Sequence, residues 1–166
     1  MDATRQIDPT IIENHATAER TSERELVVTR TINGPARIVF DSWTKPELFK
    51  QWWLPKSIGI SLLSCELDVR TGGKYRLVFG NDASKAMEFF GKYIEVIPNA
   101  RIVWTNDEGG EGGAVTTVTF EEKGDQTLLV IHDLYPSKEA ADEGSGSLDG
   151  MPETLEQLEE LLVTLA

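Results

Sequence analysis

Few residues of this chain could perform acid–base chemistry, and His132 beside Asp133 is the one place in the expected folded part where a histidine adjoins a carboxylate. Adjacent side chains in a strand point to opposite faces of a sheet, so these two cannot form a hydrogen-bonded pair with each other. A general base at His132 would therefore need a more distant partner. Asp68 and Arg70 share a strand face and are expected to form a structural ion pair. We assign no catalytic residue from these patterns.

The sequence also gives little support for metal, nucleotide or thiol chemistry. The chain has two histidines, His15 and His132, and a single cysteine, so a metal site is not expected. The glycine-rich segment 109–113 neither follows a strand nor opens a helix with the spacing that binds phosphate. Cys65 has no cysteine partner for an intrachain disulfide and lies in a strand pattern, where a buried, inert thiol is typical. No cofactor is predicted.

The charge balance excludes several classes of partner. Sixteen basic residues stand against 28 acidic ones, which gives a net charge of −12. This charge repels the phosphates of nucleic acids and anionic lipids, so neither nucleic acid nor a membrane surface is an expected partner. The longest uninterrupted apolar run, residues 128–131, is far too short to cross a membrane, and the N-terminus lacks the apolar stretch of a signal peptide. We expect a cytoplasmic protein.

The sequence divides into a polar tail over residues 1–23 and one domain over residues 24–166. Alternating apolar residues from Glu25 to Ile32 predict the first strand. Pro35 is suited to open a helix, a second short helix follows Lys45, and Pro55 ends it. Two helices are therefore expected after the first strand.

A run of strands comes next, and a helix closes the chain. Apolar and β-branched patterns predict strands near residues 58–70, 75–79, 87–97, 101–105, 117–121 and 127–134. Within 87–97 the odd and even positions are equally apolar, so the two faces of that strand cannot be assigned. Residues 108–113 are predicted to form a hairpin loop, and residues 144–147 a flexible approach to the last helix. That helix has apolar residues at steps of three and four from Leu148 to Leu165.

These elements predict an α+β fold, in which a curved antiparallel sheet of six to seven strands wraps around a long C-terminal helix. One helix cannot fill a concave sheet, so we expect a cavity between them. Trp52 and Trp53 are about 100° apart on a helix, so one of them is expected to cover the cavity entrance. The candidate ligand-binding residues, each of which could instead be an ordinary core residue, are Trp52, Trp53, Tyr75, Phe79, Phe89, Trp104, His132, Met151 and Leu155.

Several motifs in this sequence resemble those of one known family. They are Ser42-Trp43-Thr44, Gln51-Trp52-Trp53 with Pro55, the segment 65–73 that ends in two glycines, Gly91-Lys92-Tyr93-Ile94-Glu95 and the closing leucine helix. From about residue 24 to its end, the chain is similar to proteins related to the activator of the heat-shock-protein-ninety ATPase. That family is part of the START-like superfamily, also called SRPBCC, helix-grip or birch-pollen-allergen-like. The family often has Gly-Trp where this chain has Gly150-Met151, and a thioether there would leave a more adaptable cavity wall.

The resemblance implies the helix-grip fold but leaves the function open, because the superfamily includes lipid and hormone carriers, polyketide cyclases and oxygenase subunits. The first hypothesis is binding of a small hydrophobic or amphipathic ligand without chemistry. The second, which the family resemblance implies, is a protein-interaction role with a chaperone partner, as an ATPase activator. The third is a cyclase or hydrolase that uses His132, Tyr75 or Glu88 as acid or base. The identity of the ligand and the choice between monomer and homodimer stay open.

Overall fold

A computed structural model of the chain describes residues 17–81, 86–107 and 112–165. Its strands are β1 (Thr17–Ser22), β2 (Glu25–Ile32), β3 (Ser61–Leu67), β4 (Lys74–Gly80), β5 (Met87–Ile97), β6 (Arg101–Thr105), β7 (Val115–Lys123) and β8 (Gln126–Leu134). Its helices are α2 (Ala36–Thr44), α3 (Pro46–Trp52), α4 (Lys138–Gly144) and α5 (Met151–Leu165), with the 3₁₀ helices η2 (Lys56–Ile58) and η4 (Ser145–Gly150). Two helices follow β2 and a long helix closes the chain, as the sequence predicts.

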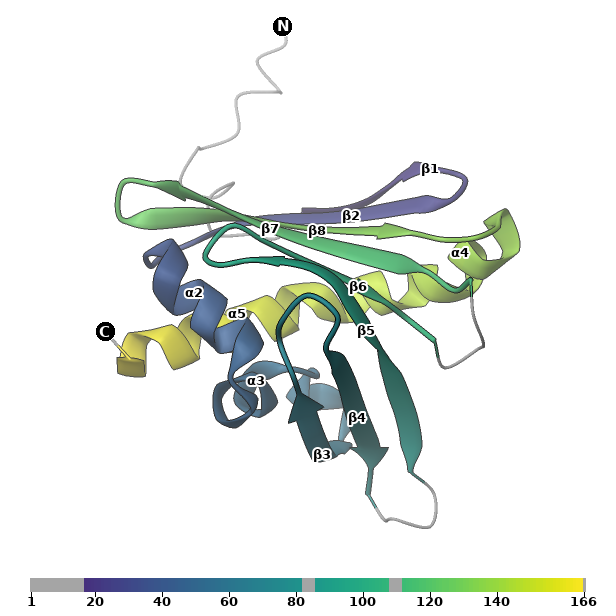
Figure 1. The fold of residues 1–166 in the computed structure, drawn as a ribbon, viewed down its shortest axis with the longest axis horizontal. Coiled ribbons are helices and arrows are strands. Elements are labelled where there is room, and N and C mark those ends of the chain that lie inside the picture. The colour runs from purple at the N-terminus through teal and green to yellow at the C-terminus, as the bar shows by residue number, and fades with distance from the viewer. Residues whose placement is uncertain (1–16, 82–85, 108–111, 166) are drawn as a thin grey trace, which may run out of the picture.

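The strands form one antiparallel sheet in the order β1-β2-β8-β7-β6-β5-β4-β3. Figure 1 shows that the sheet is strongly curved, because β3, β4 and β5 run at a steep angle to β2, β7 and β8. The register of β5 against β6 shifts between Tyr93 and Glu95. A bulge of this kind bends the strand and moves the following side chains to the other face. The predicted α+β architecture, a curved sheet with a long C-terminal helix, is therefore confirmed.

The inner face of the sheet, defined as the face toward α5, carries the core. In β2, Leu26, Val28 and Ile32 are buried while the alternate residues are partly exposed. On the same face, Arg30 forms an ion pair with Glu159 of α5 at 2.6 Å, so this face of β2 lies against α5. The buried leucines of α5 follow the spacing of one helix face and are Leu155, Leu158 and Leu162.

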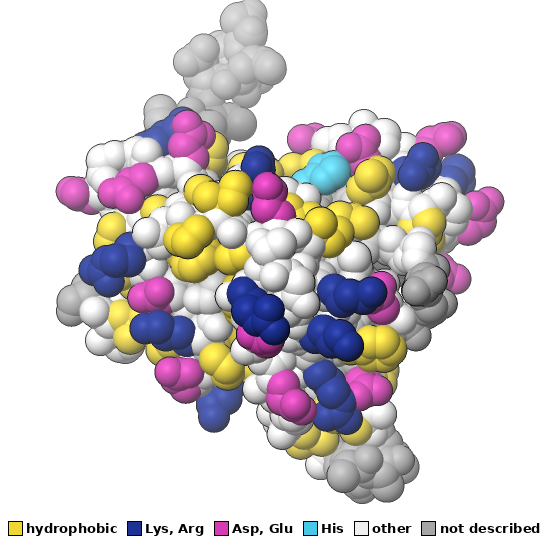
Figure 2. Space-filling view, in the orientation of Figure 1, with side chains coloured by type: hydrophobic (Ala, Val, Ile, Leu, Met, Phe, Trp, Pro, Cys, Tyr) yellow, Lys and Arg dark blue, Asp and Glu magenta, His cyan; other side chains and the backbone are white. Residues whose placement is uncertain are grey.

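The opposite, outer face of the sheet carries valine, isoleucine, leucine and threonine side chains that keep contact with solvent. Large apolar side chains are exposed here, among them Ile94 (50%), Ile97 (38%) and Leu134 (38%). Figure 2 shows apolar side chains spread over this side of the molecule, between acidic and basic ones.

The sequence predicted six to seven strands, whereas the structure has eight. The additional strand is β1, which pairs with β2 from Thr17↔Thr29 to Ser22↔Glu25 and lies in the segment expected to be a polar tail. All of its side chains are exposed. It therefore has no apolar alternation by which the sequence could have marked it as a strand.

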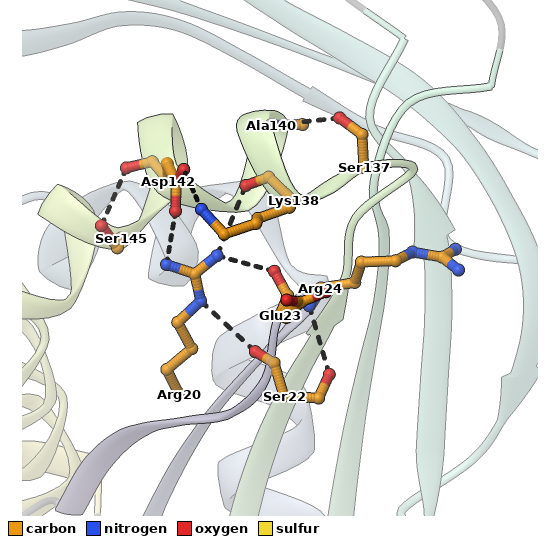
Figure 3. Close-up of polar contacts among 9 residues, drawn as sticks. All are labelled: Arg20, Ser22, Glu23, Arg24, Ser137, Lys138, Ala140, Asp142 and Ser145. Carbon is orange, nitrogen blue, oxygen red and sulfur yellow. Dashed lines mark hydrogen bonds and ion pairs between the residues drawn. The ribbon is translucent and has the colours of Figure 1, made fainter.

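The helix α4, which the sequence pattern did not predict, follows β8. The Ser137 side chain caps it by accepting a hydrogen bond from the Ala140 amide. Figure 3 shows how α4 is tied to the β1–β2 hairpin: Arg20 donates to Asp142 Oδ1 and to the Glu23 carbonyl oxygen, both at 2.6 Å. The edge strand and α4 are thus joined at one end of the sheet.

Candidate functional site

Aromatic side chains from α2 and α3 fill much of the space under the sheet. The ring centroid of Trp43 lies 4.9 Å from that of Trp52 and 6.0 Å from that of Trp104 on β6. Trp52 is fully buried, and its Nε1 donates to the Ser42 carbonyl oxygen at 2.9 Å. Trp43 is also buried, and its Nε1 is the only fully buried side-chain nitrogen or oxygen among the described residues without a hydrogen-bond partner. Side chains therefore occupy much of the region where the sequence predicted a cavity.

Trp53 directly follows α3, and its ring also packs on the aromatic cluster: its centroid lies 5.7 Å from that of Trp43 and 4.9 Å from that of Phe49. It is partly exposed and lines a depression of about 250 Å³ between the end of α3, the start of β3 and α5, next to Leu62 and Gln157. One tryptophan is therefore in the core and the other at an opening on the surface. Both rings nevertheless contact Trp43, and the expectation that one of them covers a cavity entrance stays a prediction.

Gln157 of α5 fixes the turn that carries Trp53. Its Nε2 donates to the carbonyl oxygens of Trp52 (3.0 Å) and Leu54 (2.8 Å), and its Oε1 accepts from the Lys56 amide (2.9 Å). Leu54 has a φ of 87°, which is uncommon for a residue with a Cβ atom. The side chain of Gln157 holds this unusual backbone in place on both sides of Trp53.

A row of inner-face residues crosses the sheet beside the aromatic cluster. Trp104 of β6 pairs with Thr116 of β7, and Thr116 pairs with Asp133 of β8. Each lies two positions from a buried residue of its own strand, so the three share the inner face. Those buried residues are Ile102, Val118 and Ile131. Trp104 and Asp133 are partly exposed, so the inner face is not sealed along this row.

Hydrogen bonds orient the middle of this row. Asn106 Nδ2 donates to Thr116 Oγ1 at 3.0 Å, and Thr116 Oγ1 donates to Asp133 Oδ1. The Tyr75 hydroxyl donates to the Thr105 carbonyl oxygen at 2.7 Å and lies 3.4 Å from Asn106 Oδ1. Because Asn106 uses an acceptor position of the Thr116 hydroxyl, the hydroxyl proton is free to point at Asp133.

The carboxyl group of Asp133 is incompletely paired. Burial raises its pKa above the ordinary value of 3.8, against the hydrogen bond from Thr116 and the charge of His132, which lower it. Its Oδ2 accepts no hydrogen bond from any residue that the structure describes. Among the described residues, the fully buried side-chain atom without a partner is Trp43 Nε1. Asp133 Oδ2 also has no partner there but is not fully buried, so it keeps contact with solvent. The inner face therefore presents one accessible acceptor two strands away from Trp104.

The segment between β8 and α5 packs against itself and against the turn that follows α3. Tyr135 packs so closely on Gly144 that a Cβ atom there would lie 2.3 Å from Tyr135 Oη. A Cβ atom at Gly150 would lie 2.9 Å from Pro55 Cγ, two residues beyond Trp53. The first contact is internal to the segment, and the second joins the segment to the turn that carries Trp53.

His132 lies outside this site. It is on the outer face, where its Nε2 is 2.8 Å from Glu25 Oε2, while Asp133 faces inward, as predicted for consecutive strand residues. Glu88 is also on the outer face, in an ion pair with Arg76. The structure therefore corrects the placement of His132 among the cavity residues, because the alternation that buries Leu129 and Ile131 directs His132 outward.

The other predicted site residues lie on the inner side of the sheet. Those buried in the core are Trp52, Tyr75, Phe79 and Leu155, and those partly buried at its margin are Trp53, Phe89, Trp104 and Met151. Sequence reasoning missed Asn106, Thr116 and Gln157. A signal was nevertheless present in the sequence. Asn106 and Thr116 are polar residues at positions where the strand alternation predicts apolar ones, and Gln157 is a polar residue on the leucine-rich face of α5.

Outside the site, the residues singled out in the sequence have ordinary surroundings. Asp68 and Arg70 form an exposed ion pair at 3.0 Å, as predicted. Burial raises the pKa of the Cys65 thiol to about 11, which agrees with an inert cysteine. A depression of about 390 Å³ over the outer side of β4 is lined by ionic groups that pair with one another, Arg76 with Glu66 and Glu88.

Within the described ranges, no three histidine, cysteine, aspartate or glutamate side chains are placed to hold a metal ion. No described helix combines the length and apolar character needed to cross a membrane. The central part of the glycine-rich segment, residues 108–111, lies outside the described residues.

Comparison with protein families gives one match. The family model described as "Activator of Hsp90 ATPase homolog 1-like protein" matches residues 33–163. No curated protein matches the chain.

Solved structures share the fold. A crystal structure of a protein from Rhodobacter sphaeroides has a TM-score of 0.82 at 19% identity, over 91% of this chain and 99% of that chain. A solution structure of a protein from Staphylococcus epidermidis has a TM-score of 0.75 at 27% identity, over 90% of this chain and 95% of that chain. The AHSA1-like protein from Aeromonas hydrophila has a TM-score of 0.64 at 15% identity, over 84% of this chain and 93% of that chain.

Proposed function

We propose that this chain, which belongs to the Activator of Hsp90 ATPase homolog 1-like family, binds a small apolar or amphipathic molecule on the inner face of its sheet. The observation that supports this most is the partial exposure of Trp104, a large aromatic side chain on the face that otherwise forms the core. Trp53, Phe89 and Met151 are likewise only partly buried at the margin of the core. Large apolar side chains that stay accessible on a concave face are typical of ligand sites.

The expected driving force is burial of apolar surface. A ligand that covers about 250 Å² of apolar surface gains about 6 kcal/mol before the entropy of association is subtracted. This gain suits a compound of one or two rings with micromolar affinity. Because the aromatic cluster around Trp43 occupies much of the space under the sheet, a long acyl chain is not the ligand that we propose.

Mass spectrometry of the purified protein under native conditions, followed by solvent extraction, tests whether a small molecule accompanies it. Nile red, a neutral dye, reports on the site without repulsion from the net charge. We expect micromolar dye binding that Trp104→Ala weakens about tenfold, since the side chain is a large part of the apolar contact. Ile97→Ala on the outer face is the matched control and should leave the affinity unchanged. No dye uptake by the unchanged protein would reject the proposal.

A second candidate function is interaction with an Hsp90-type chaperone, as the printed family description suggests. The exposed Ile94, Ile97 and Leu134 on the outer face favour it, because a partner could cover them. The measurement is the ATP turnover of purified chaperone with saturating amounts of this protein. A rate increase that Ile97→Glu removes and Trp104→Ala leaves intact would support this role, and an unchanged rate would dismiss it.

The structure gives no support to the third hypothesis, a cyclase or hydrolase. Its three acid–base candidates do not converge: His132 and Glu88 are on the outer face, and the Tyr75 hydroxyl donates to the Thr105 carbonyl oxygen. We do not propose an enzymatic reaction.

A further inference from the structure

We propose that Asp133 Oδ2 is the hydrogen-bond acceptor that recognises a hydroxyl or amine group of the ligand, while Trp104 contacts the apolar body of the same molecule. The ligand would then be a compact amphipathic compound with one or two rings and a hydrogen-bond donor at one end. This inference depends on the proposed function, because it assigns the polar contact within the same inner-face site.

The spacing of the row fits such a molecule. Trp104, Thr116 and Asp133 are successive register partners on three neighbouring strands. Adjacent strands lie about 5 Å apart, so the Cα atoms of Trp104 and Asp133 are about 10 Å apart. A molecule with one or two rings can therefore pack against the indole and still present a polar group to the carboxylate.

The hydrogen-bond network leaves one acceptor free and fixes the position of the other. Thr116 donates to Oδ1, and its own hydroxyl oxygen is held by Asn106, so the Asp133 side chain is fixed. Oδ2 is left without a donor among the described residues and keeps contact with solvent. A fixed carboxylate oxygen that is accessible and unpaired is a ready partner for a donor on a ligand.

A purely structural role accounts less well for this carboxylate. Asp133 lies two positions from Ile131 and opposite Leu26, both of them buried. An apolar residue would suit these neighbours, and burying a carboxylate without full pairing is unfavourable. Asp133 has no cationic partner on its own face within the described ranges: Arg20 is bound to Asp142, Arg30 to Glu159, and His132 lies on the opposite face. The missing partner is what a ligand donor would provide.

The test uses two probes with the same apolar body. 2-Naphthol carries a hydroxyl donor, and 2-methoxynaphthalene carries an ether oxygen that cannot donate. Their dissociation constants for the full chain are measured by isothermal titration calorimetry at neutral pH. We expect 2-naphthol to bind at least about tenfold more tightly, which is the lower end of the range for a hydrogen bond to a charged group.

Variants at and near Asp133 assign the preference to this carboxylate. Asp133→Ala should bind the two probes equally, with the affinity that the unchanged protein shows for 2-methoxynaphthalene. Asp133→Asn keeps the size of the side chain and an oxygen for Thr116, so it should fold and should reduce the preference to about threefold or less. Val130→Ala, on the outer face of the same strand and uncharged, is the matched control and should keep the full preference.

The outcomes separate the two proposals. If both probes bind equally to the unchanged protein, or if Asp133→Ala and Asp133→Asn keep its preference for 2-naphthol, the role of Asp133 is refuted while the inner-face site stands. If neither probe binds, the proposed function fails and the role of Asp133 fails with it.

Discussion

The indole Nε1 of Trp52 donates to the carbonyl oxygen of Ser42 at 2.9 Å, which ties the buried end of α3 to α2. Trp52→Phe removes this hydrogen bond and part of a fully buried ring, so we expect a loss of about 2 kcal/mol in the free energy of unfolding. Urea denaturation followed by circular dichroism measures it. Trp53→Phe, at the partly exposed neighbour, should change the free energy of unfolding by less than about 1 kcal/mol. Equal losses in the two variants would contradict the assignment of one ring to the core and the other to the opening.

Gln157 is expected to control the turn that carries Trp53. Gln157→Leu removes three hydrogen bonds to the backbone of residues 52–56 and should cost about 2 to 3 kcal/mol of stability. Hydrogen exchange should become faster at the amides of this turn, because they lose their link to α5. Gln51→Leu is the matched control, since Gln51 is exposed and its side chain bonds only within α3. If hydrogen exchange at residues 52–56 is unchanged in Gln157→Leu, the turn is held by other contacts.

The ion pair between Arg30 and Glu159 joins β2 to α5, and Arg30 is only 5% exposed. Glu159→Ala leaves a buried guanidinium without its partner, so we expect the free energy of unfolding to fall by about 2 kcal/mol. The expected loss is smaller than for a fully buried pair because Glu159 is partly exposed. The double variant Arg30→Met with Glu159→Leu should recover most of this loss. Glu160→Ala, at an exposed position of the same helix, serves as the control. A double variant as unstable as Glu159→Ala would show that the pair is not the main contact.

The stability of the protein should depend on the protonation of Asp133. Burial raises its pKa in the folded state above the ordinary value of 3.8, so the folded protein disfavours the ionised form. Stability is therefore reduced as the pH rises through the interval between the unfolded and the folded pKa. We expect Asp133→Asn to be more stable than the unchanged protein at pH 7, and the difference to shrink as the pH approaches 3. Denaturation curves at several pH values measure this, and a variant that is less stable at pH 7 would contradict it.

Cys65 should be unreactive in the folded protein. Because burial raises its pKa to about 11, the thiolate is a very small fraction of the thiol at neutral pH. Alkylation by iodoacetamide at pH 7.5 should be at least about tenfold slower than in the urea-unfolded chain, whose thiol has an ordinary pKa near 8.5. Equal rates in the two states would mean that the thiol is more accessible than the structure shows.

The apolar alternation predicted most strands and the fold class, and the places where it failed have local causes. In β5 both faces looked equally apolar because the bulge between Tyr93 and Glu95 exchanges the faces within one strand. Phe89 and Tyr93 therefore face inward at odd positions before the bulge, and Val96 faces inward after it. No pattern of period two can describe a strand of this kind.

The candidate site was harder to predict than the fold. The aromatic residues near it could be recognised, because tryptophans close together in a short helix are conspicuous. The polar residues could not, since Thr116 and Asp133 become neighbours only through the pairing of β7 with β8. The orientation of His132 followed from strand alternation alone once Leu129 and Ile131 were known to be buried.

The central claim is that a small amphipathic molecule binds on the inner face, between Trp104 and Asp133. Intermolecular nuclear Overhauser effects between 2-naphthol and the isotope-labelled protein test it most directly. The proposal predicts contacts from the naphthalene protons to the indole of Trp104 and the methyl group of Thr116, which lies between Trp104 and Asp133. Contacts confined to outer-face residues such as Val130 and Ile97 would contradict it.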